Sequence, residues 1–550
     1  MKKILSLGLM TALSIGLYAQ SIDEAKTNLY YGKTTSAINT LNQLISSNAK
    51  NADAVYWLGQ AHLRNDELQK AKTVYNNAIQ SGVQSPLLSV GVGHVALLEG
   101  DNARAKQLFE EAIANTIKRR KENPEILAAV GRANADGAST LGDPAYGIAV
   151  LQRAAAIDPS NPETYVNMGI SYLKLGSDKG GDAYEAFMNA LKIDPHHAAA
   201  KYRLGKLFLT QNNREKFEGY FIGATESDPK YAPAYLELYN YYAQRDVNKA
   251  RTFLESYMAN SDKDCQVDFF YADYLFRAGK YQESIDKGNA MLNGACKDLP
   301  RLPVLLAYNY DRLGDTTKSR ENIEKYLSTA AADKIQPDDY LLAATVLKKM
   351  PGREDAAIKY LMVALDKDTL KANQIMFMDT IASLYRKKGD FDQRLQWLQK
   401  SFVINPNPSN LDIYNIGEAA FQVGKLELAD SMFSEYATKY PDQIYGHLGV
   451  AKTAIAVDKD TTTGSAVPAV KNLITVLEKN DVERNKSIIL QNYGYLVYVH
   501  ANVFKDYQAA LNELEGILRI DPENDYAKQT SEQIKKVMAA SNKQASKGSK

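Results

Sequence analysis

The sequence has no excess of charge of either sign and, after its first twenty residues, no long apolar run. Lys and Arg number 66 against 65 Asp and Glu, which leaves a net charge of +1 on 550 residues. Such a balance provides no field that would attract nucleic acid or an anionic membrane surface. No later segment reaches the roughly 20 apolar residues that span a bilayer. We therefore expect neither general nucleic-acid binding nor a transmembrane segment in the mature chain.

Motifs for metal binding and catalysis are also missing. The six histidines show no paired i, i+4 spacing, and His196 and His197 follow a proline in a predicted solvated turn. A calcium loop beginning at Asp458 would need its glycine at Thr463 and its bidentate acid at Ala469, so it fails. No Gly-x-Ser-x-Gly elbow organises the serines. The sequence therefore predicts no catalytic residue, no metal and no cofactor.

One stretch does match a cofactor motif loosely. Residues 91 to 96 read Gly-Val-Gly-His-Val-Ala, the pattern G-x-G-x-x-G/A. This pattern cradles a pyrophosphate only where a strand enters a glycine turn and a helix leaves it. Here Leu88, Val92 and Val95 form a helical stripe, and no strand-helix-strand unit follows. We expect a helix and no dinucleotide site.

The N-terminus predicts export. Lys2 and Lys3 precede an apolar run from Ile4 to Leu17, and Ala19 precedes a candidate cleavage point, so residues 1–19 read as a signal peptide. The alternative, a membrane anchor, needs a longer run. No cysteine follows that would mark a lipoprotein. We expect a periplasmic protein, with secretion or outer-membrane association as alternatives.

Small residues recur at a spacing of 34. Ala37, Ala71 and Ala105 are the first of them, and an apolar or aromatic residue follows each after four positions. Gly59 and Gly93 stand twelve positions before the second and third alanine. The marker position recurs in fourteen candidate units, at residues 37, 71, 105, 147, 183, 217, 250, 284, 319, 357, 394, 429, 469 and 510. Fixed periods of this length are typical of helical repeat arrays.

This pattern resembles the tetratricopeptide repeat from about residue 22 to residue 522. The clearest copy is residues 165–195, in which Gly169 would meet Ala183 at a close helix crossing and Pro195 ends the second helix. The clearest repeats span 52–118 and 162–231, and the middle, about 265–400, is irregular. The resemblance implies an all-α fold, a right-handed α-solenoid of about fourteen helical hairpins.

Several segments depart from the repeat. The solenoid is expected over 20–540, with a protruding loop insertion at 458–468. A capping helix is predicted at about 523–539, and the basic residues 541–550 are expected to be disordered.

The two cysteines fall in one predicted hairpin. Cys265 begins the first helix of its unit and Cys296 lies just past the end of the second. Antiparallel helices return the chain to its starting end, so an exported protein could join the two thiols. Two separate buried thiols remain the alternative.

The resemblance implies a binding groove lined by the second, fifth, ninth and twelfth places of each unit. These groove residues include Tyr202, Lys206, Asn240, Phe269, Asp273, Phe276, Tyr308, Asp311, Arg386, Tyr414, Glu418 and Phe421. Aromatic anchors between charges suit a peptide or helix partner. We expect a non-catalytic scaffold that binds protein partners, within a cell-envelope or outer-membrane assembly. An enzyme subunit with a site in an irregular repeat, or a secreted surface-binding protein, remain alternatives.

Overall fold

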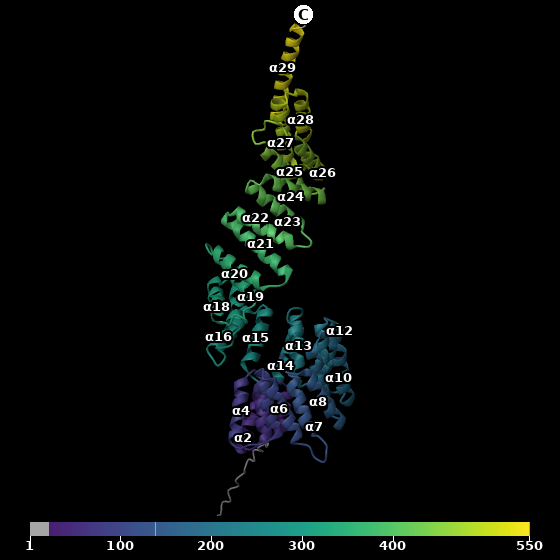
Figure 1. Ribbon diagram of the computed structural model, residues 1–550. Coiled ribbons are helices and arrows are strands. Elements are labelled where there is room, and N and C mark those ends of the chain that lie inside the picture. The colour runs from purple at the N-terminus through teal and green to yellow at the C-terminus, as the bar shows by residue number, and fades with distance from the viewer. Residues whose placement is uncertain (1–20, 138, 549–550) are drawn as a thin grey trace, which may run out of the picture. The chain divides into compact units, whose positions relative to one another are not determined.

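The computed structural model describes residues 21–137 and 139–548, and those residues contain helices but no β-strand (Figure 1). The predicted signal peptide, residues 1–19, lies outside the described residues. The chain divides into two compact units, residues 1–305 and 306–550, with the boundary inside helix α17. The all-α solenoid of helical hairpins is confirmed, because fourteen helix pairs, α1/α2 through α27/α28, follow one another among the described residues.

The first unit contains eight hairpins. Its helices are α1 (Ile22–Tyr30), α2 (Thr34–Ser47), α3 (Ala52–Arg64), α4 (Leu68–Gln80), α5 (Pro86–Leu98), α6 (Asn102–Ala114), α7 (Pro124–Asn134), α8 (Pro144–Ile157), α9 (Pro162–Leu175), the short 3₁₀ helix η1 (Ser177–Lys179), α10 (Gly180–Ile193), α11 (Ala198–Thr210), α12 (Arg214–Ser227), α13 (Ala232–Tyr242), α14 (Val247–Asn260), α15 (Cys265–Arg277) and α16 (Tyr281–Leu292).

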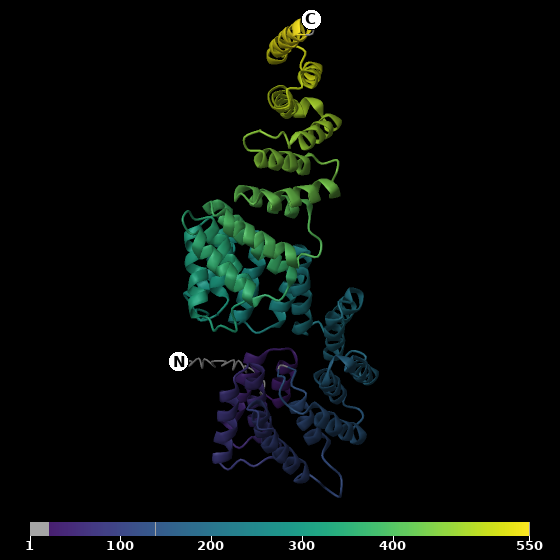
Figure 2. The same cartoon turned by 45° about the horizontal axis from the view of Figure 1, so that its top comes forward.

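The second unit continues the pattern, and Figure 2 shows several of its paired helices stacked one after another. Its helices are α17 (Leu302–Arg312), which crosses the boundary, α18 (Thr316–Thr329), α19 (Pro337–Lys348), α20 (Glu354–Lys367), α21 (Lys371–Lys388), α22 (Phe391–Ile404), α23 (Asn410–Gln422), α24 (Leu426–Lys439), α25 (Ile444–Val457), α26 (Val467–Asn480), α27 (Val482–Tyr498), the π-helical turn η2 (Val499–Val503), α28 (Tyr507–Ile520) and α29 (Asp525–Gly548).

Local sequence explains where the helices begin and end. Gly100 adopts a left-handed φ of 84° between α5 and α6, a conformation that glycine reaches without steric cost. The carboxylate of Asp101 then accepts the N–H of Arg104 at 3.1 Å and caps the N-terminus of α6. At the end of the fifth unit, α10 stops at Ile193, two residues before Pro195, as predicted.

In several hairpins the core contains a glycine of the first helix that faces an aromatic ring of the second. A Cβ atom built on Gly93 would lie 2.5 Å from the ring of Phe109, and one on Gly169 would lie 2.3 Å from the ring of Phe187. At the predicted crossing of Gly169 with Ala183, the atoms nearest to that Cβ belong to the ring of Phe187. The flat ring four residues after the alanine fills the crossing, and Ala183 is itself fully buried.

The marker position is buried in thirteen of the fourteen second helices, including Gly147 in α8 and Arg394 in α22. Ala469 is the exception. In α26 the fully buried residue is its neighbour Val470, so the register predicted for this unit is off by one residue. The insertion before α26 contains no regular spacing that could have fixed the register.

Two further segments were singled out by the sequence. In the insertion before α26, the Asp458 carboxylate accepts the backbone N–H groups of Thr462 and Thr463 at 3.1 Å and of Gly464 at 2.7 Å. Helix α29 continues to Gly548, through residues predicted to be disordered. Adding a residue to an existing helix costs far less than nucleating one, and Ala, Gln and Lys are good helix formers. The middle range, predicted irregular, forms four hairpins from α15 to α22.

Successive first helices, the odd-numbered ones, pack against one another in the first unit from α1 through α11, and α23 packs against α25 in the second. Successive second helices make no comparable contact among the described residues. From α1 through α11, the array therefore curves with its first helices on the inner side. We call the side of each unit formed by the odd-numbered helices the first-helix face, and every predicted groove residue lies on one of these helices.

Candidate interaction surface

Predicted groove residues in the first unit form a ladder between neighbouring hairpins. In α11, the Lys206 ammonium donates to the Glu237 carboxylate of α13 at 2.8 Å, and the Tyr202 hydroxyl donates to the same oxygen at 3.3 Å. Burial and the nearby Glu237 charge raise the pKa of Tyr202 to about 12, so its hydroxyl stays protonated at neutral pH. These side chains bridge consecutive first helices and remain half-exposed.

The next rung joins α13 to α15. The Tyr239 hydroxyl donates to the Asp273 carboxylate at 3.0 Å, and Arg277 Nε donates to the same carboxylate oxygen at 2.7 Å. Asn240, one residue further along α13, is exposed on this face. The remaining two predicted residues of the unit, Phe269 and Phe276, are half-buried against an apolar cluster that includes Ala272, Met291 and Leu302.

The second unit repeats this arrangement. The Lys349 ammonium, just past the end of α19, donates to the Asp311 carboxylate of α17 at 2.6 Å. One hairpin, α21/α22, separates this rung from one in which Lys452 of α25 lies 3.3 Å from the Glu418 carboxylate of α23. The same ammonium lies 4.0 Å from the centroid of the Phe421 ring, close enough for a cation–π interaction.

The other predicted residues of the second unit differ in exposure. Tyr414 packs against the rings of Phe433, Tyr436 and Tyr445, with centroids 5.7, 6.3 and 6.1 Å away, and stays half-exposed. Arg386 is exposed near the end of α21, and Tyr308 is half-buried in α17. The twelve predicted residues thus lie six in each unit, as two separate surfaces of aromatic rings and paired charges.

The N-terminal hairpin closes back on later hairpins of its own unit, which the sequence did not predict. The Tyr30 ring lies 5.1 Å from Tyr231 and 6.0 Å from His197, centroid to centroid, and its hydroxyl accepts the N–H of Ala199 at 3.2 Å. Ser36 donates both its N–H and its hydroxyl to the Asp262 carboxylate, at 3.1 and 2.5 Å. Residues 167 to 226 positions apart therefore meet, and the first unit forms a closed turn.

Charged side chains of the first-helix face gather inside this closed turn. The Arg132 guanidinium lies over the Trp57 indole, 4.7 Å from its centroid, and Glu163 lies 3.3 Å from His197 Nε2. Burial lowers the pKa of Arg64, and the positive charges of Arg132 and Arg203 lower it further, against the opposing charge of Glu163. Yet Arg64 is exposed by surface area, and Glu163 keeps 49% of its side-chain surface.

Sequence reasoning missed this arginine group, although one signal was present. Arg132 directly follows Gly131, as Lys206 directly follows Gly205, and both therefore occupy the ninth place of their units. Arg64 occupies a different place in its unit. Only the curvature of the first unit brings its charge within the influence of Arg132 and Arg203.

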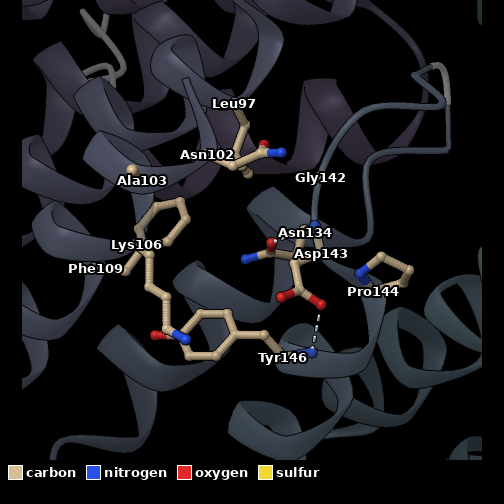
Figure 3. A pocket seen from close by; sticks show the side chains of 10 residues that line it. All are labelled: Leu97, Asn102, Ala103, Lys106, Phe109, Asn134, Gly142, Asp143, Pro144 and Tyr146. Carbon is tan, nitrogen blue, oxygen red and sulfur yellow. Dashed lines mark hydrogen bonds between the residues drawn. The ribbon is translucent and has the colours of Figure 1, made fainter. Parts of the chain in front are cut away.

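A pocket of about 410 Å³ lies between α6, the α7–α8 connection and the start of α8 (Figure 3). Leu97, Phe109 and Pro144 form apolar parts of its wall, and Lys106 lies along the Tyr146 ring, 5.5 Å from its centroid. The polar groups already serve the fold, because Asp143 accepts the N–H of Tyr146 at 2.9 Å and Asn134 accepts the N–H of Asp143 at 3.1 Å. These lining residues contain no nucleophile paired with a base.

The two cysteines lie at disulfide distance, with Cα atoms 5.4 Å apart across the α15/α16 hairpin. Within the part of the chain that the structure describes, no three His, Cys, Asp or Glu side chains are grouped as metal ligands. In the same residues, no helix combines the length and the apolar character that a bilayer crossing needs.

Comparison with known proteins places the repeats in a family. Tetratricopeptide repeat profiles match residues 22–86 and 175–240, and both matched ranges coincide with helical hairpins of the first unit. These two segments of the chain are therefore tetratricopeptide repeats. A tetratricopeptide repeat-containing protein of Methanocaldococcus jannaschii is 30% identical over 151 residues, which is 27% of this chain and 24% of that protein. The match therefore spans about a quarter of the relative's length.

Solved tetratricopeptide repeat structures are similar at a coarser level. The C-terminal part of a repeat-containing protein from Cytophaga hutchinsonii is 27% identical. The match covers 48% of this chain and 98% of that structure's chain, with a TM-score of 0.38. Yeast Tom70 is 11% identical over 74% of this chain and 96% of its own, with a TM-score of 0.36. Tetratricopeptide repeats imply protein partners in general, and they commonly form scaffolds.

Proposed function

We propose that the protein is a non-catalytic scaffold that binds protein or peptide partners along the first-helix face of each unit. The observation that supports this most is the ladder of half-exposed aromatic rings beside paired charges, as in Phe421, Glu418 and Lys452. Rings of this kind supply contact area at low entropic cost, and a polar rim of charges sets orientation. A helix or an extended peptide laid across successive first helices would meet both.

The proposal includes export to the periplasm and a place in a cell-envelope assembly. Lys2 and Lys3 before the apolar run of residues 4–17 support export. The approach of Cys265 to Cys296 suits an oxidising compartment, where such a pair persists as a disulfide. Fractionation of cells that express the full chain tests this directly: we expect the mature chain in the periplasmic fraction, and retention in the cytoplasm would contradict export.

The binding surface can be tested by removing two rings from the second unit. In the double variant Tyr414→Ala, Phe421→Ala, capture of partners from envelope extract should fall about tenfold or more, since buried aromatic anchors commonly contribute about 2 kcal/mol or more each. The matched control is Tyr360→Ala, an aromatic residue on the second helix α20. Circular dichroism should show equal helix content in all three proteins. Equal capture by the double variant and the control would contradict the assignment of the surface.

The enzyme alternative predicts a different result. A scaffold should show no turnover by itself and should recover the same defined partners in repeated captures. Turnover by the purified chain, unaffected by Tyr414→Ala and Phe421→Ala, would contradict the non-catalytic assignment.

A further inference from the structure

The connection between α6 and α7 contains an insertion that its neighbours lack. Residues 115–123 join these two helices, whereas residues 81–85 are enough between α4 and α5 and residues 158–161 between α8 and α9. Within the longer connection, Lys118 and Lys121 exchange both backbone hydrogen bonds, at 3.0 and 2.9 Å. The chain therefore reverses in a two-residue turn between these lysines, beyond the ends of both helices.

This turn holds two arginines in a backbone conformation that arginine rarely adopts. Arg119 and Arg120 have φ values of 50° and 68°, in the left-handed region. Two-residue turns with positive φ at both central positions favour Asn-Gly, because most other side chains are strained there. A turn that merely joined two helices would gain nothing from arginine at these positions. Backbone strain of this kind clusters at functional sites.

All four residues of the turn are cationic and exposed. Residues 118–121 read Lys-Arg-Arg-Lys, and each of them is open to solvent. In the part of the chain that the structure describes, none of the four forms an ion pair. Ile117, directly before them, keeps 50% of its surface exposed. The tip of the connection therefore combines four unpaired cations with an exposed apolar side chain.

Carboxylates of the flanking sequence lie at the base of the turn. Glu110 and Glu111 belong to α6, before the connection begins. Glu122 follows the turn and is paired with Arg153 of α8, whose Nε donates to it at 3.0 Å. Glu125 is exposed in the first turn of α7. At the end of the connection, the four cations therefore outnumber the carboxylates that oppose them.

The neighbouring connections add little charge to this edge of the array. Residues 81–85 carry none. Residues 158–161 carry Asp158 alone, and its carboxylate already accepts the N–H and the hydroxyl of Ser160, at 3.1 and 2.6 Å. The positive charge is thus concentrated in the inserted turn.

A projecting cationic tip fits a plane of anions better than it fits a peptide strand. The backbone groups through which Lys118 and Lys121 bind each other cannot pair with an added strand. A bilayer surface needs no groove, since its headgroups can reach every side chain of a protruding turn. Ile117 could enter the boundary between headgroups and acyl chains. Because the net charge of the chain is +1, this attraction acts only within about a Debye length, roughly 10 Å at 0.1 M salt.

We infer that residues 117–121 form a docking site for a bilayer surface rich in anionic phospholipid. The four cations bind the phosphate headgroups, and Ile117 inserts beside them. A single tip of this size gives reversible attachment that salt weakens. This site goes beyond the proposed capture of protein partners and does not depend on it, because it lies in a connection and not on the first-helix face.

Sedimentation of the purified mature chain, which lacks the apolar residues 4–17, with lipid vesicles tests the inference. We expect binding to vesicles of equal parts phosphatidylcholine and phosphatidylglycerol, and little to phosphatidylcholine alone. The sharpest variant joins Arg119→Asn with Arg120→Gly, because it removes two cations yet supplies the residues that the turn favours. Its affinity for the anionic vesicles should fall about twentyfold, since each basic residue near such a surface contributes about fivefold.

A second pair of variants separates lost binding from lost structure. Lys118→Gln with Lys121→Gln leaves the central turn residues in place and should weaken binding by a similar factor. Arg214→Gln with Arg251→Gln removes the same charge from exposed, glutamate-paired positions of α12 and α14 and should leave binding unchanged. The melting temperature of the Asn-Gly turn variant should not fall below that of the parent.

Three results would overturn the inference. The first is equal binding of the parent to both kinds of vesicle. The second is binding of anionic vesicles by both turn variants as strong as that of the parent. The third is tighter binding of the parent to a polyglutamate peptide than to the anionic vesicles, which would assign the turn to an acidic protein instead.

Discussion

Glycines inside the helices serve two opposite roles that their sequence context alone does not separate. Gly93 lies under the ring of Phe109, where an added Cβ would come within 2.5 Å of the ring. Gly219, in the middle of α12, is exposed, and an added Cβ there would meet nothing within 4 Å. The first glycine is required by packing, whereas the second only lowers helix stability.

The same substitution at these two glycines should therefore have opposite effects. Gly219→Ala should stabilise its hairpin by about 0.5 to 1 kcal/mol, since alanine loses less backbone entropy in a helix. Gly93→Ala should destabilise by about 1 to 3 kcal/mol, because Phe109 must move in a filled core. Hydrogen exchange of α5, α6 and α12 measures both effects locally. Increased protection of α5 and α6 in Gly93→Ala would contradict the packing role.

Asp458 shows how a residue considered for calcium binding serves the fold instead. Burial raises the pKa of this carboxyl, but the N–H groups of Thr463 and Gly464, together with that of Thr462, lower it more, so the net pKa lies below its usual value. A group whose pKa is lowered by folding stabilises the native state above its unfolded pKa, and that contribution is lost as the pH falls through the folded pKa.

Asp458→Asn should accordingly loosen the α25–α26 connection at neutral pH, because an amide offers one acceptor oxygen where the carboxylate offers two. We expect faster proteolysis and faster amide exchange in residues 458–466 at pH 7. The difference from the parent should persist at pH 5 and shrink below about pH 3.9, the unfolded value for Asp. Asp460→Asn, at an exposed position, is the control. Equal exchange in Asp458→Asn and the parent at pH 7 would contradict the account.

Helical hairpins are the elements most fully specified by the sequence. The spacing of 34 between Ala37, Ala71 and Ala105, with a ring or leucine four residues later, places each second helix, and Pro195 marks an end. The register failed at Ala469, where an insertion precedes the helix. At Gly169 the spacing located the helix face, but it did not show that the ring of Phe187, four residues after Ala183, lies nearest to the glycine.

The α15/α16 hairpin differs from the others in its cysteines. A bridge between Cys265 and Cys296 closes a segment of 31 residues, for which chain entropy assigns roughly 3 to 4 kcal/mol. Repeat arrays couple mainly to nearest neighbours, so the stabilisation should be local. Thiol titration of unreduced protein should find no free thiol. Reduction should expose two and speed amide exchange in α15 and α16, while α5 and α6 stay unchanged. Two titratable thiols in the unreduced folded protein would refute the bridge.

At the scale of the whole molecule, the sequence period predicted which side chains lie on the first helices. It did not predict which other side chains they contact. The predicted groove residues do lie on first helices, but several of them are bonded to side chains that were not predicted, as Lys206 is to Glu237 and Asp311 is to Lys349. The contact of Tyr30 with Tyr231 could not be predicted, because it depends on small rotations summed over six hairpins.

The central claim is that partners bind the first-helix face, and site-specific photo-crosslinking in intact cells tests it most directly. A photoreactive amino acid is placed at Asn240 and Arg386, exposed positions on the first helices α13 and α21. Arg251 and Glu435, exposed positions on the second helices α14 and α24, serve as matched controls. The account predicts discrete, reproducible protein adducts from Asn240 or Arg386 and none of the same mass from the controls. Adducts from Arg251 and Glu435 alone, or from no position at all, would contradict it.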